Sequence, residues 1–367
     1  MQLTTANAAP YLVARRLMHP DVIVDGDLMA IDSSRRNRNV KLRRRNGTGL
    51  FLKQVQSAEP ADLAAVQREA ACYRLPLEHP ALAPLARIMP RYRHYDAATR
   101  ILTMDLIPDG ESLYLHMRTA HVMEPAIARA LGEALATLHA ADLAGALDAE
   151  TLARTFPATT PWILSAHEFT PANTSAAVSG ANHQLFDLVR RHPGFKEALQ
   201  SARDEWQHDR LIHGDMKWDN CLVHLPDGNQ PVITFADWEL ADRGDPAWDV
   251  GALFQAWLAH WIGSIPEGTN APPSQLAAMA TIPLDAMHPA IRAFWDAYRT
   301  ARALTGSEHD AFLLRATRAA GARMIQTAYE SLAMVPQLSA NMVLLLQVSL
   351  NVLTRAQDAQ RQLLALA

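Results

Sequence analysis

The stretch HGDMKWDN, residues 213–220, most constrains what this chain can fold into. It gathers two aspartates, a histidine, a lysine and an asparagine between two apolar pairs, Leu211–Ile212 and Leu222–Val223. Charges this dense between apolar runs predict a loop held between two buried strands, because a solvated surface turn has no need of apolar flanks. A further apolar strand, VITFADWE, residues 232–239, follows and carries Asp237 near its end.

Three oxygen-bearing side chains of these two segments suggest a chemistry. Asp215, Asn220 and Asp237 together offer two carboxylates and an amide, and Mg²⁺ prefers such hard oxygen ligands and takes only a few of them from protein. Phosphoryl transfer needs positioning, cations on the phosphates and a carboxylate that accepts the proton of the attacking hydroxyl. The residue types therefore favour phosphoryl transfer.

The order and spacing of the motifs resemble a known family. H-G-D-x-x-x-x-N, then Asp-Trp-Glu, then Gly244–Asp245–Pro246 and Asp249, is similar to the aminoglycoside phosphotransferase and choline kinase group of the protein-kinase-like superfamily. The resemblance runs from about residue 25 to 330. It implies an α+β, bilobal protein-kinase-like fold. A small nucleotide-binding β-sheet lobe with one key helix is expected over residues 1–107, and a larger, mostly helical catalytic and acceptor-binding lobe over residues 108–367.

The same resemblance assigns roles to matching residues. It implies that Asp215 is the catalytic base and that Asn220 and Asp237 hold Mg²⁺, with ATP as the phosphoryl donor. It also implies that His213 holds the loop and that Asp249 braces the loop from the following helix.

The N-terminal third mixes strand and helix patterns. VIVDG (residues 22–26) and LMAID (28–32) read as short strands around a turn, and Asn46–Gly47 predicts a hairpin between residues 39–45 and 49–55. A helix is expected over residues 61–75, and RILTMDLIP, residues 100–108, reads as a buried strand. Helical patterns dominate after that strand.

Lys53 and Glu69 are expected to form the ion pair that orients the nucleotide phosphates. Lys53 lies on the third strand, and Glu69 lies on the apolar stripe of the helix, between Val66 and Tyr73, where a charge needs a partner. The alternative is an edge lysine and a surface glutamate without a joint role. The downstream motif favours the ion pair.

The expected phosphate-covering turn contains no glycine. Residues 33–39 read SSRRNRN, so Ser33, Ser34, Asn37 and backbone amides are the groups that would approach phosphate. The basic residues of this region either form a solvated hairpin face or meet ATP phosphates or an anionic partner, including an acidic peptide. Nucleic acid is not an expected partner, because no aromatic side chains interleave with the charges. These basic residues are Arg35, Arg36, Arg38, Lys41, Arg43, Arg44 and Arg45.

The strand at residues 100–108 leads into the connection between the expected lobes. By the family resemblance, the backbone from Met104 to Leu106 receives the edge of the adenine ring. The sequence does not decide which amide does so.

The composition and the apolar stretches of the chain indicate where in the cell the protein is expected. The chain of 367 residues carries a net charge of −4 and only two cysteines, so neither a disulfide framework nor a general attraction to nucleic acid is expected. The start of the chain lacks the pattern of a signal peptide, and the longest apolar stretch, residues 342–353, is too short to span a membrane. We therefore expect a cytoplasmic protein.

The acceptor is left open between three readings. The first is a kinase for a hydroxyl of a small molecule. The second is a Ser/Thr kinase for a peptide in a natural-product pathway that forms dehydroamino acids, since Lys217, two residues after Asp215, gives the loop a protein-kinase character, unless it only faces solvent. The third is a nucleotide-binding pseudokinase that scaffolds a partner protein.

Overall fold

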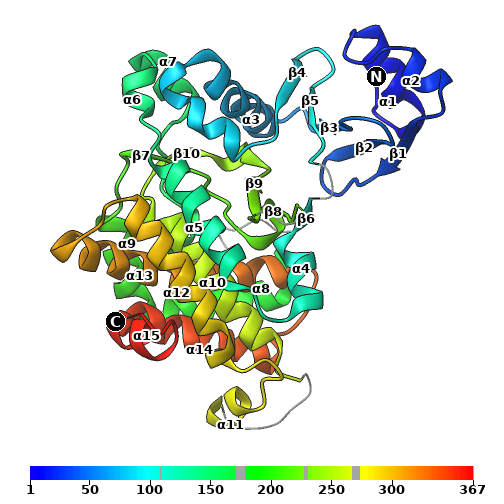
Figure 1. Ribbon diagram of the computed structural model, residues 1–367. Helices are drawn as coiled ribbons and strands as arrows, with labels where there is room; N and C mark the ends of the chain where they lie inside the picture. The colour runs from blue at the N-terminus through cyan, green and yellow to red at the C-terminus, as the bar shows by residue number, and fades with distance from the viewer. Residues whose placement is uncertain (108–109, 171–177, 227–229, 267–272, 367) are drawn as a thin grey trace.

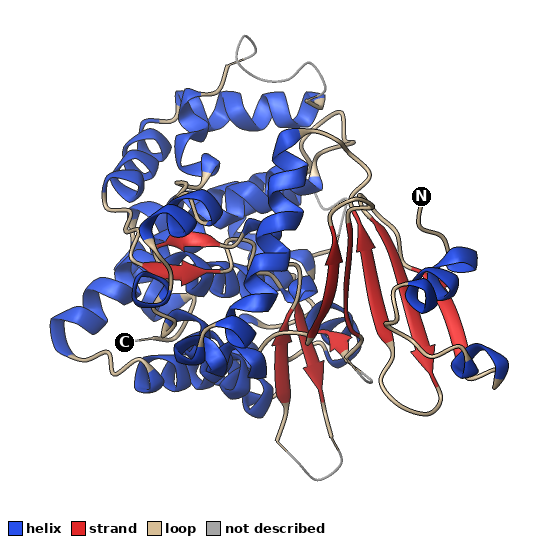
Figure 2. Cartoon of the chain, turned by 90° about the horizontal axis from the view of Figure 1, so that it is seen from above, coloured by secondary structure: helices blue, strands red, loops and turns tan. Residues whose placement is uncertain are grey.

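The computed structural model describes residues 1–107, 110–170, 178–226, 230–266 and 273–366. The N-terminal third of the chain contains the five-stranded sheet and a few helices, and helices make up most of the rest (Figure 1). Seen from above, the long strands lie to one side of the helical body (Figure 2). This is the α+β, kinase-like architecture that the sequence predicts, and the predicted fold class is confirmed. The predicted boundary at residue 108 lies outside the described residues.

The N-terminal sheet has five antiparallel strands in the spatial order β1-β2-β3-β5-β4. One face is apolar because residues alternate along the strands, so that Val40 and Leu42 of β2 point the same way as Leu52 of β3. Helix α1 covers this face with Leu12. The strands are β1 (Leu28–Asp32), β2 (Arg38–Arg44), β3 (Leu50–Gln54), β4 (Tyr92–Asp96) and β5 (Ile101–Asp105).

The helices of this part are α1 (Thr5–Ala14), α2 (Asp21–Val24), α3 (Pro60–Glu78) and the 3₁₀ helix η1 (Pro80–Arg87). The strand predicted for VIVDG is wrong, because these residues form α2 and the turn after it. Pro20 precedes the helix and Asp21 lies in its first turn, both of which favour a helix start. The edge strand β1 pairs only with β2, so VIVDG meets no partner strand among the described residues.

Helices make up most of the rest of the described chain. The main packing pairs are α5 with α12, α10 with α13, and α13 with α14. The helices are α4 (Leu113–Ala120), α5 (Pro125–His139), α6 (Leu143–Ala146), α7 (Ala149–Thr155), η2 (Trp162–Glu168), α8 (Gly180–Arg191), α9 (Pro193–Asp204), α10 (Ala247–Gly263), α11 (Pro273–Ala278), α12 (Leu284–Ala301), α13 (Gly306–Ser331), α14 (Ala340–Thr354) and α15 (Ala356–Gln362).

Two small sheets hold the 213–220 loop. Strand β7 (Arg210–Ile212) enters the loop and pairs with β10 (Asp242–Gly244), and β8 (Cys221–His224) leaves it between β6 (Glu111–Ser112) and β9 (Val232–Phe235). Short 3₁₀ turns, η3 (Trp218–Asn220) and η4 (Trp238–Leu240), follow the loop and β9. The stretch is thus the loop between buried strands that its flanks predict.

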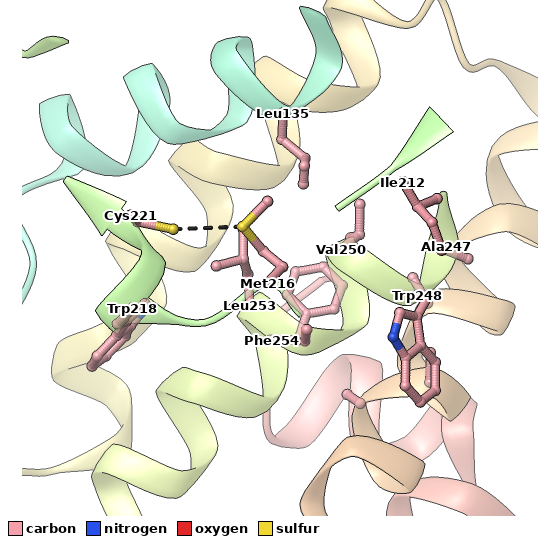
Figure 3. Close-up of a cluster of buried hydrophobic side chains, with 14 of the residues drawn as sticks. Leu135, Ile212, Met216, Trp218, Cys221, Ala247, Trp248, Val250, Leu253 and Phe254 are labelled. Carbon is pink, nitrogen blue, oxygen red and sulfur yellow. Dashed lines mark hydrogen bonds between the residues drawn. The ribbon is translucent and has the colours of Figure 1, made fainter. Parts of the chain in front are cut away.

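Apolar residues within the loop anchor it to the helical core. Met216 is fully buried, and it lies in Figure 3 among side chains of α5 and α10, including Leu135 and Phe254. The Cys221 thiol contacts the Met216 sulfur at 3.5 Å, and Trp218 is also buried. Because buried apolar residues alternate with charged ones from 215 to 218, Met216 and Trp218 anchor the charged side chains of the loop.

No helix of the described residues combines the length and the apolar character that crossing a membrane requires.

Candidate functional site

Lys53 lies at the centre of a cluster of carboxylates. Its ammonium is 2.8 Å from Glu69 Oε2 and 3.0 Å from Glu239 Oε2, and it also donates a hydrogen bond to Asp237 Oδ1. The Lys53–Glu69 pair joins β3 to α3, as the helical pattern predicts, and the contact with Asp237 joins the sheet to the segment after β9. We call Lys53, Glu69, Asp237 and Glu239 the lysine cluster.

Burial and charge oppose each other in the lysine cluster. Burial lowers the pKa of the Lys53 ammonium, but the three carboxylates outweigh burial and hold the pKa well above its ordinary value. Burial also raises the pKa of Glu69 to about 7, against the attraction of Lys53. The lysine therefore stays charged, while Glu69 takes up a proton more readily than an ordinary glutamate.

Asp237 holds an unusual backbone conformation. Its φ of 66° and ψ of 60° place it in the left-handed region, which a residue other than glycine rarely occupies. Its side chain is 39% exposed, whereas the Glu69 side chain is 1% exposed. The turn thus directs one carboxylate of the lysine cluster toward solvent, and such conformations concentrate at functional sites.

Asp215 lies at the centre of a second cluster, in which one carboxylate faces two cationic side chains. Its Oδ2 is 2.6 Å from the Lys217 ammonium, and its Oδ1 is 3.6 Å from the Arg323 guanidinium. The Asn220 amide donates to the Asp215 backbone oxygen at 2.9 Å and to Oδ2 at 3.2 Å. We call Asp215, Lys217, Asn220 and Arg323 the aspartate cluster.

Burial raises the pKa of Asp215, but Arg323 and then Lys217 outweigh burial and bring it below its ordinary value. Lys217 shows the mirror effect: burial lowers its pKa, and Asp215 raises it above the ordinary value. Asp215 is therefore ionised at neutral pH, the state in which a carboxylate can accept a proton.

Backbone hydrogen bonds fix the loop that carries Asp215. The Asp249 carboxylate accepts from the backbone N–H groups of His213 at 2.6 Å and Gly214 at 3.1 Å, so Asp249 braces the loop from α10. Gly214 has a φ of +77°, and a Cβ there would lie 2.3 Å from the backbone oxygen of Leu240. Only glycine fits this position without strain.

The backbone of Ala236 links the two clusters. Its N–H donates to the backbone oxygen of Asn220 at 2.9 Å, and its carbonyl lies 3.0 Å from His213 Nε2. Ala236 directly precedes Asp237, so the two ends of the 213–220 loop are tied to the residue next to the exposed carboxylate. His213 thus has the structural contact expected of it.

The donor atoms in this region fit a magnesium ion. The Asn220 amide nitrogen faces Asp215, which leaves its amide oxygen without a hydrogen bond among the described residues, and Asp237 offers a partly exposed carboxylate. Oxygen atoms of Glu69, Asp237 and Glu239 also lie within 4.8 Å of one another. Carboxylate and amide oxygens are the ligands that Mg²⁺ takes.

The serines of the 33–39 turn bond within the turn itself. Ser33 donates its N–H to Asn39 O at 2.9 Å, and Ser34 Oγ accepts from the Asn39 N–H at 3.1 Å. Asn37 contributes its carbonyl, which accepts from the Arg35 N–H at 3.1 Å. These contacts close the turn without glycine, and none of them reaches either cluster.

Two arginines of the turn, Arg35 and Arg36, make the contacts with carboxylates near the clusters. Arg36 contacts Asp62 at 2.6 Å and Glu239 at 3.5 Å, and Arg35 lies 3.9 Å from Asp219 in the 213–220 loop. Part of the basic stretch thus pairs with carboxylates of this chain.

Met104 and Leu106 lie at the end of β5, next to the sheet. Met104 is buried opposite Phe51 of β3. The Leu106 N–H donates to Gly49 O at 3.0 Å, so this amide is already engaged in the sheet.

Sequence reasoning missed two residues of the clusters. Glu239 stands two positions after Asp237, and its contact with Lys53 makes it a third carboxylate. Arg323 lies on α13 among alanines, where a charge on an apolar helix face gives the same signal that identified Glu69. That signal was available, but the partner lies more than a hundred residues away in the sequence.

The model of the phosphotransferase enzyme family matches residues 27–294 of the chain. The chain belongs to this family. The family resemblance stated from the sequence is confirmed, and so is the prediction of a kinase-type phosphotransferase. A comparison with curated proteins finds no match for this phosphotransferase.

Solved structures agree in fold. An ethanolamine kinase of Plasmodium vivax gives a TM-score of 0.54 at 13% identity, covering 94% of this phosphotransferase and 85% of that chain. An aminoglycoside phosphotransferase with bound GDP and kanamycin gives 0.50 at 17% identity, covering 94% and 99%. At these identities the likeness shows the kinase-like fold alone.

Proposed function

We propose that this phosphotransferase moves the γ-phosphoryl group of ATP, bound with Mg²⁺, to a hydroxyl group of a small-molecule acceptor. Asp215 is the base, and Lys217 steadies the transferred group. Lys53, held by Glu69, contacts the phosphates, and Asn220 and Asp237 hold the metal. Ser33, Ser34 and Asn37 cover the phosphates, and the backbone from Met104 to Leu106 borders the nucleobase.

One observation carries this proposal: the hydrogen bond of Lys53 to Asp237 across 184 positions of sequence. It brings the lysine of the sheet to the segment that Ala236 ties to the 213–220 loop. A phosphate-binding cation, two oxygen ligands for a metal and an ionised base are thereby held in one hydrogen-bonded network. Phosphoryl transfer requires this set of groups, and little else from the protein.

The bound nucleotide would supply the phosphoryl group, and a magnesium ion held by Asn220 and Asp237 would neutralise the negative charge that develops on the phosphate oxygens. The protein contributes the proton acceptor. As the acceptor oxygen bonds to the γ-phosphorus, the bond from that phosphorus to the β–γ bridging oxygen breaks, nucleoside diphosphate leaves, and the hydroxyl proton passes to Asp215. The pKa of Asp215 lies below its ordinary value, so this carboxylate is ready to accept the proton at neutral pH.

The substitution Asp215→Asn tests the role of the base. We expect phosphoryl transfer to fall on the order of 10²–10⁴-fold, because the amide cannot accept the proton, while nucleotide affinity changes little. The assay uses Mg-ATP or Mg-GTP with ethanolamine, kanamycin and other hydroxyl compounds as acceptors, and calorimetry measures nucleotide binding.

Asp209→Asn is the matched control, since Asp209 is exposed and its ion pair is with the neighbouring Arg210. Full activity of Asp215→Asn contradicts the proposed base. Nucleotide binding by the wild-type protein, without turnover on any acceptor, supports the scaffold reading instead.

A further inference from the structure

His139 is a fully buried histidine at the end of α5, in the interior of the helical part. Its two ring nitrogens have different partners: Nδ1 lies 2.8 Å from the Tyr298 hydroxyl, and Nε2 lies 3.2 Å from Asp249 Oδ2. Three helices meet at this ring, because Tyr298 belongs to α12 and Asp249 to α10. These hydrogen bonds reach neither the lysine cluster nor the aspartate cluster, so the histidine takes no direct part in the proposed reaction.

The close packing of α5 against α12 brings His139 and Tyr298 together. The two helices form one of the main packing pairs and lie side by side in Figure 1. Gly132, about two turns before His139, allows the close approach, since a Cβ there would lie 2.4 Å from the backbone oxygen of Phe294 on α12. The rings of His139 and Tyr298 meet edge-on, with 5.6 Å between their centres. The hydrogen bond between them is therefore part of the helix packing.

The chemistry of its partners decides which nitrogen of His139 carries the proton. Burial lowers the pKa of His139, against the hydrogen bond to Asp249 that raises it, so the ring is neutral at pH 7 and has one N–H. A carboxylate oxygen accepts, so Nε2 is the donor to Asp249 and Nδ1 is an acceptor. The Tyr298 hydroxyl donates to Nδ1, and burial raises the pKa of Tyr298, which keeps that hydroxyl protonated.

Packing alone does not account for these two polar side chains. His139 follows the buried Leu135 and Leu138 on α5, and an apolar side chain there fills the space without burying polar nitrogens. The Tyr298 ring stacks with Phe294, a contact that phenylalanine makes equally well. What the polar atoms add is a line of hydrogen bonds that ends on the Asp249 carboxylate.

The N–H of His139 completes the set of donors around the buried Asp249 carboxylate. Oδ2 also accepts from the backbone N–H of His213 at 2.6 Å, and Oδ1 accepts from the N–H of Gly214 at 3.1 Å. Oδ2 is thus shared between α5 and the loop. A buried carboxylate that loses a donor is left partly unsatisfied and turns toward other groups. Because Gly214 directly precedes Asp215, such a turn displaces the residue that the proposed function makes the base.

We propose that His139 is a positioning residue for the loop that carries Asp215. With its proton on Nε2 and its Nδ1 held by Tyr298, it fixes the Asp249 carboxylate. That carboxylate fixes the backbone of Gly214, and so the place of Asp215 beside the acceptor hydroxyl. This inference rests on the proposed function, in which Asp215 is the base.

The first measurement reads the ring of His139 in the nucleotide-free protein. ¹⁵N NMR of histidine-labelled protein, with His139→Gln to assign the signals, is expected to show a proton on Nε2 and none on Nδ1 at pH 7. In Tyr298→Phe, which removes only the hydroxyl, the Nδ1 signal should move because its hydrogen bond is lost. A proton on Nδ1 in the wild type, or an Nδ1 signal that stays in place in Tyr298→Phe, overturns the inference.

The second measurement follows the loop and the reaction in His139→Leu, which keeps an apolar side chain but donates nothing to Asp249. We expect kcat to fall on the order of tenfold or more, because a small displacement of a reacting group is costly. Calorimetry should give an unchanged Kd for Mg-ATP, and hydrogen exchange of the Gly214 amide should quicken. His139→Gln, whose amide can still donate to Asp249, should recover most of kcat. A purely structural role predicts no such recovery, since both variants lose the ring.

The matched control is His288→Leu on α12. This histidine is partly buried, and its Nε2 lies 3.2 Å from the backbone oxygen of Leu363, so the substitution removes a similar contact at another place. Its kcat and Gly214 exchange should equal those of the wild type. If His139→Leu does not fold, Tyr298→Phe takes its place, with a smaller expected fall in kcat. Wild-type kcat and wild-type Gly214 exchange in the folded variant overturn the inference.

The variant Asp215→Asn separates this inference from the proposed function. If Asp215→Asn loses activity while His139→Leu keeps the kcat and the Gly214 exchange of the wild type, His139 has no positioning role and the proposed function stands. If Asp215→Asn keeps full activity, the proposed function fails. The ring signals and the exchange of the Gly214 amide then still show whether His139 holds the loop.

Discussion

The lysine cluster and the aspartate cluster are built from the same kinds of groups with opposite charge balance. In the lysine cluster one ammonium faces three carboxylates, and in the aspartate cluster one carboxylate faces two cations. The lysine cluster has a surplus of negative charge, part of it on the exposed Asp237. The aspartate cluster has a surplus of positive charge, part of it buried on Arg323.

This difference suggests different tasks. Surplus carboxylate beside a partly exposed oxygen ligand suits a cluster that changes partners when a divalent cation and phosphates arrive. A carboxylate held by cations from two sides suits a group whose ionisation must not change between cycles. The following predictions test whether the two clusters differ in this way.

The largest effect is expected for Lys53→Met. Removing the ammonium leaves three carboxylates facing one another, and breaking such a buried pair costs about 3 kcal/mol of unfolding free energy. Urea unfolding measures this loss. The loss should shrink toward pH 5, because Glu69, whose pKa lies at about 7, takes up a proton and relieves the repulsion.

The double variant Lys53→Met, Glu69→Gln is the control for charge imbalance. We expect it to recover part of the lost stability but no phosphoryl transfer, because the cation proposed to contact phosphate is still missing. Equal stability of Lys53→Met and the wild type at pH 8 would show that the lysine cluster does not depend on its cation.

A smaller effect is expected for Lys217→Met. The lysine is more than a third exposed, so solvent screens its charge, and the stability should change by less than about 1 kcal/mol. The titration midpoint of Asp215 should rise, since the charge and the hydrogen bond of Lys217 both lower this pKa. Phosphoryl transfer should fall on the order of tenfold or more as a charge on the transferred group is lost. An unchanged Asp215 midpoint in Lys217→Met would contradict the influence of this lysine on the carboxylate.

The smallest effect is expected for Arg36→Gln. Its side chain is 68% exposed, so its ion pairs with Asp62 and Glu239 should contribute less than about 1 kcal/mol to stability. The KM for nucleotide should still rise a few-fold, because Arg36 ties the 33–39 turn to the lysine cluster. Arg43→Gln, an exposed arginine of β2, is the matched control. Equal KM values for the two variants would mean that the turn acts without Arg36.

Local sequence signals predicted much of this arrangement and failed where contacts span the chain. Lys53 and Glu69 were found because a charge on an apolar stripe needs a partner, and the loop was found because apolar pairs flank it. Arg323 gives the same signal, but its partner is fixed only by the packing of α13 against the 213–220 loop. VIVDG failed for the opposite reason, since its composition suits a strand but the sheet ends at β1. Strand pairing is decided by the sheet and not by five residues.

Residue 236 shows what a comparison of side chains overlooks. Alanine at this position carries no reactive group, yet its backbone N–H and its carbonyl are both engaged by opposite ends of the neighbouring loop. The relative position of Asp237 and Asp215 is therefore fixed by main-chain atoms, which any amino acid other than proline supplies. Engineering that alters acceptor choice has freedom in the surrounding side chains, provided that the two peptide planes that meet at residue 236 stay where they are.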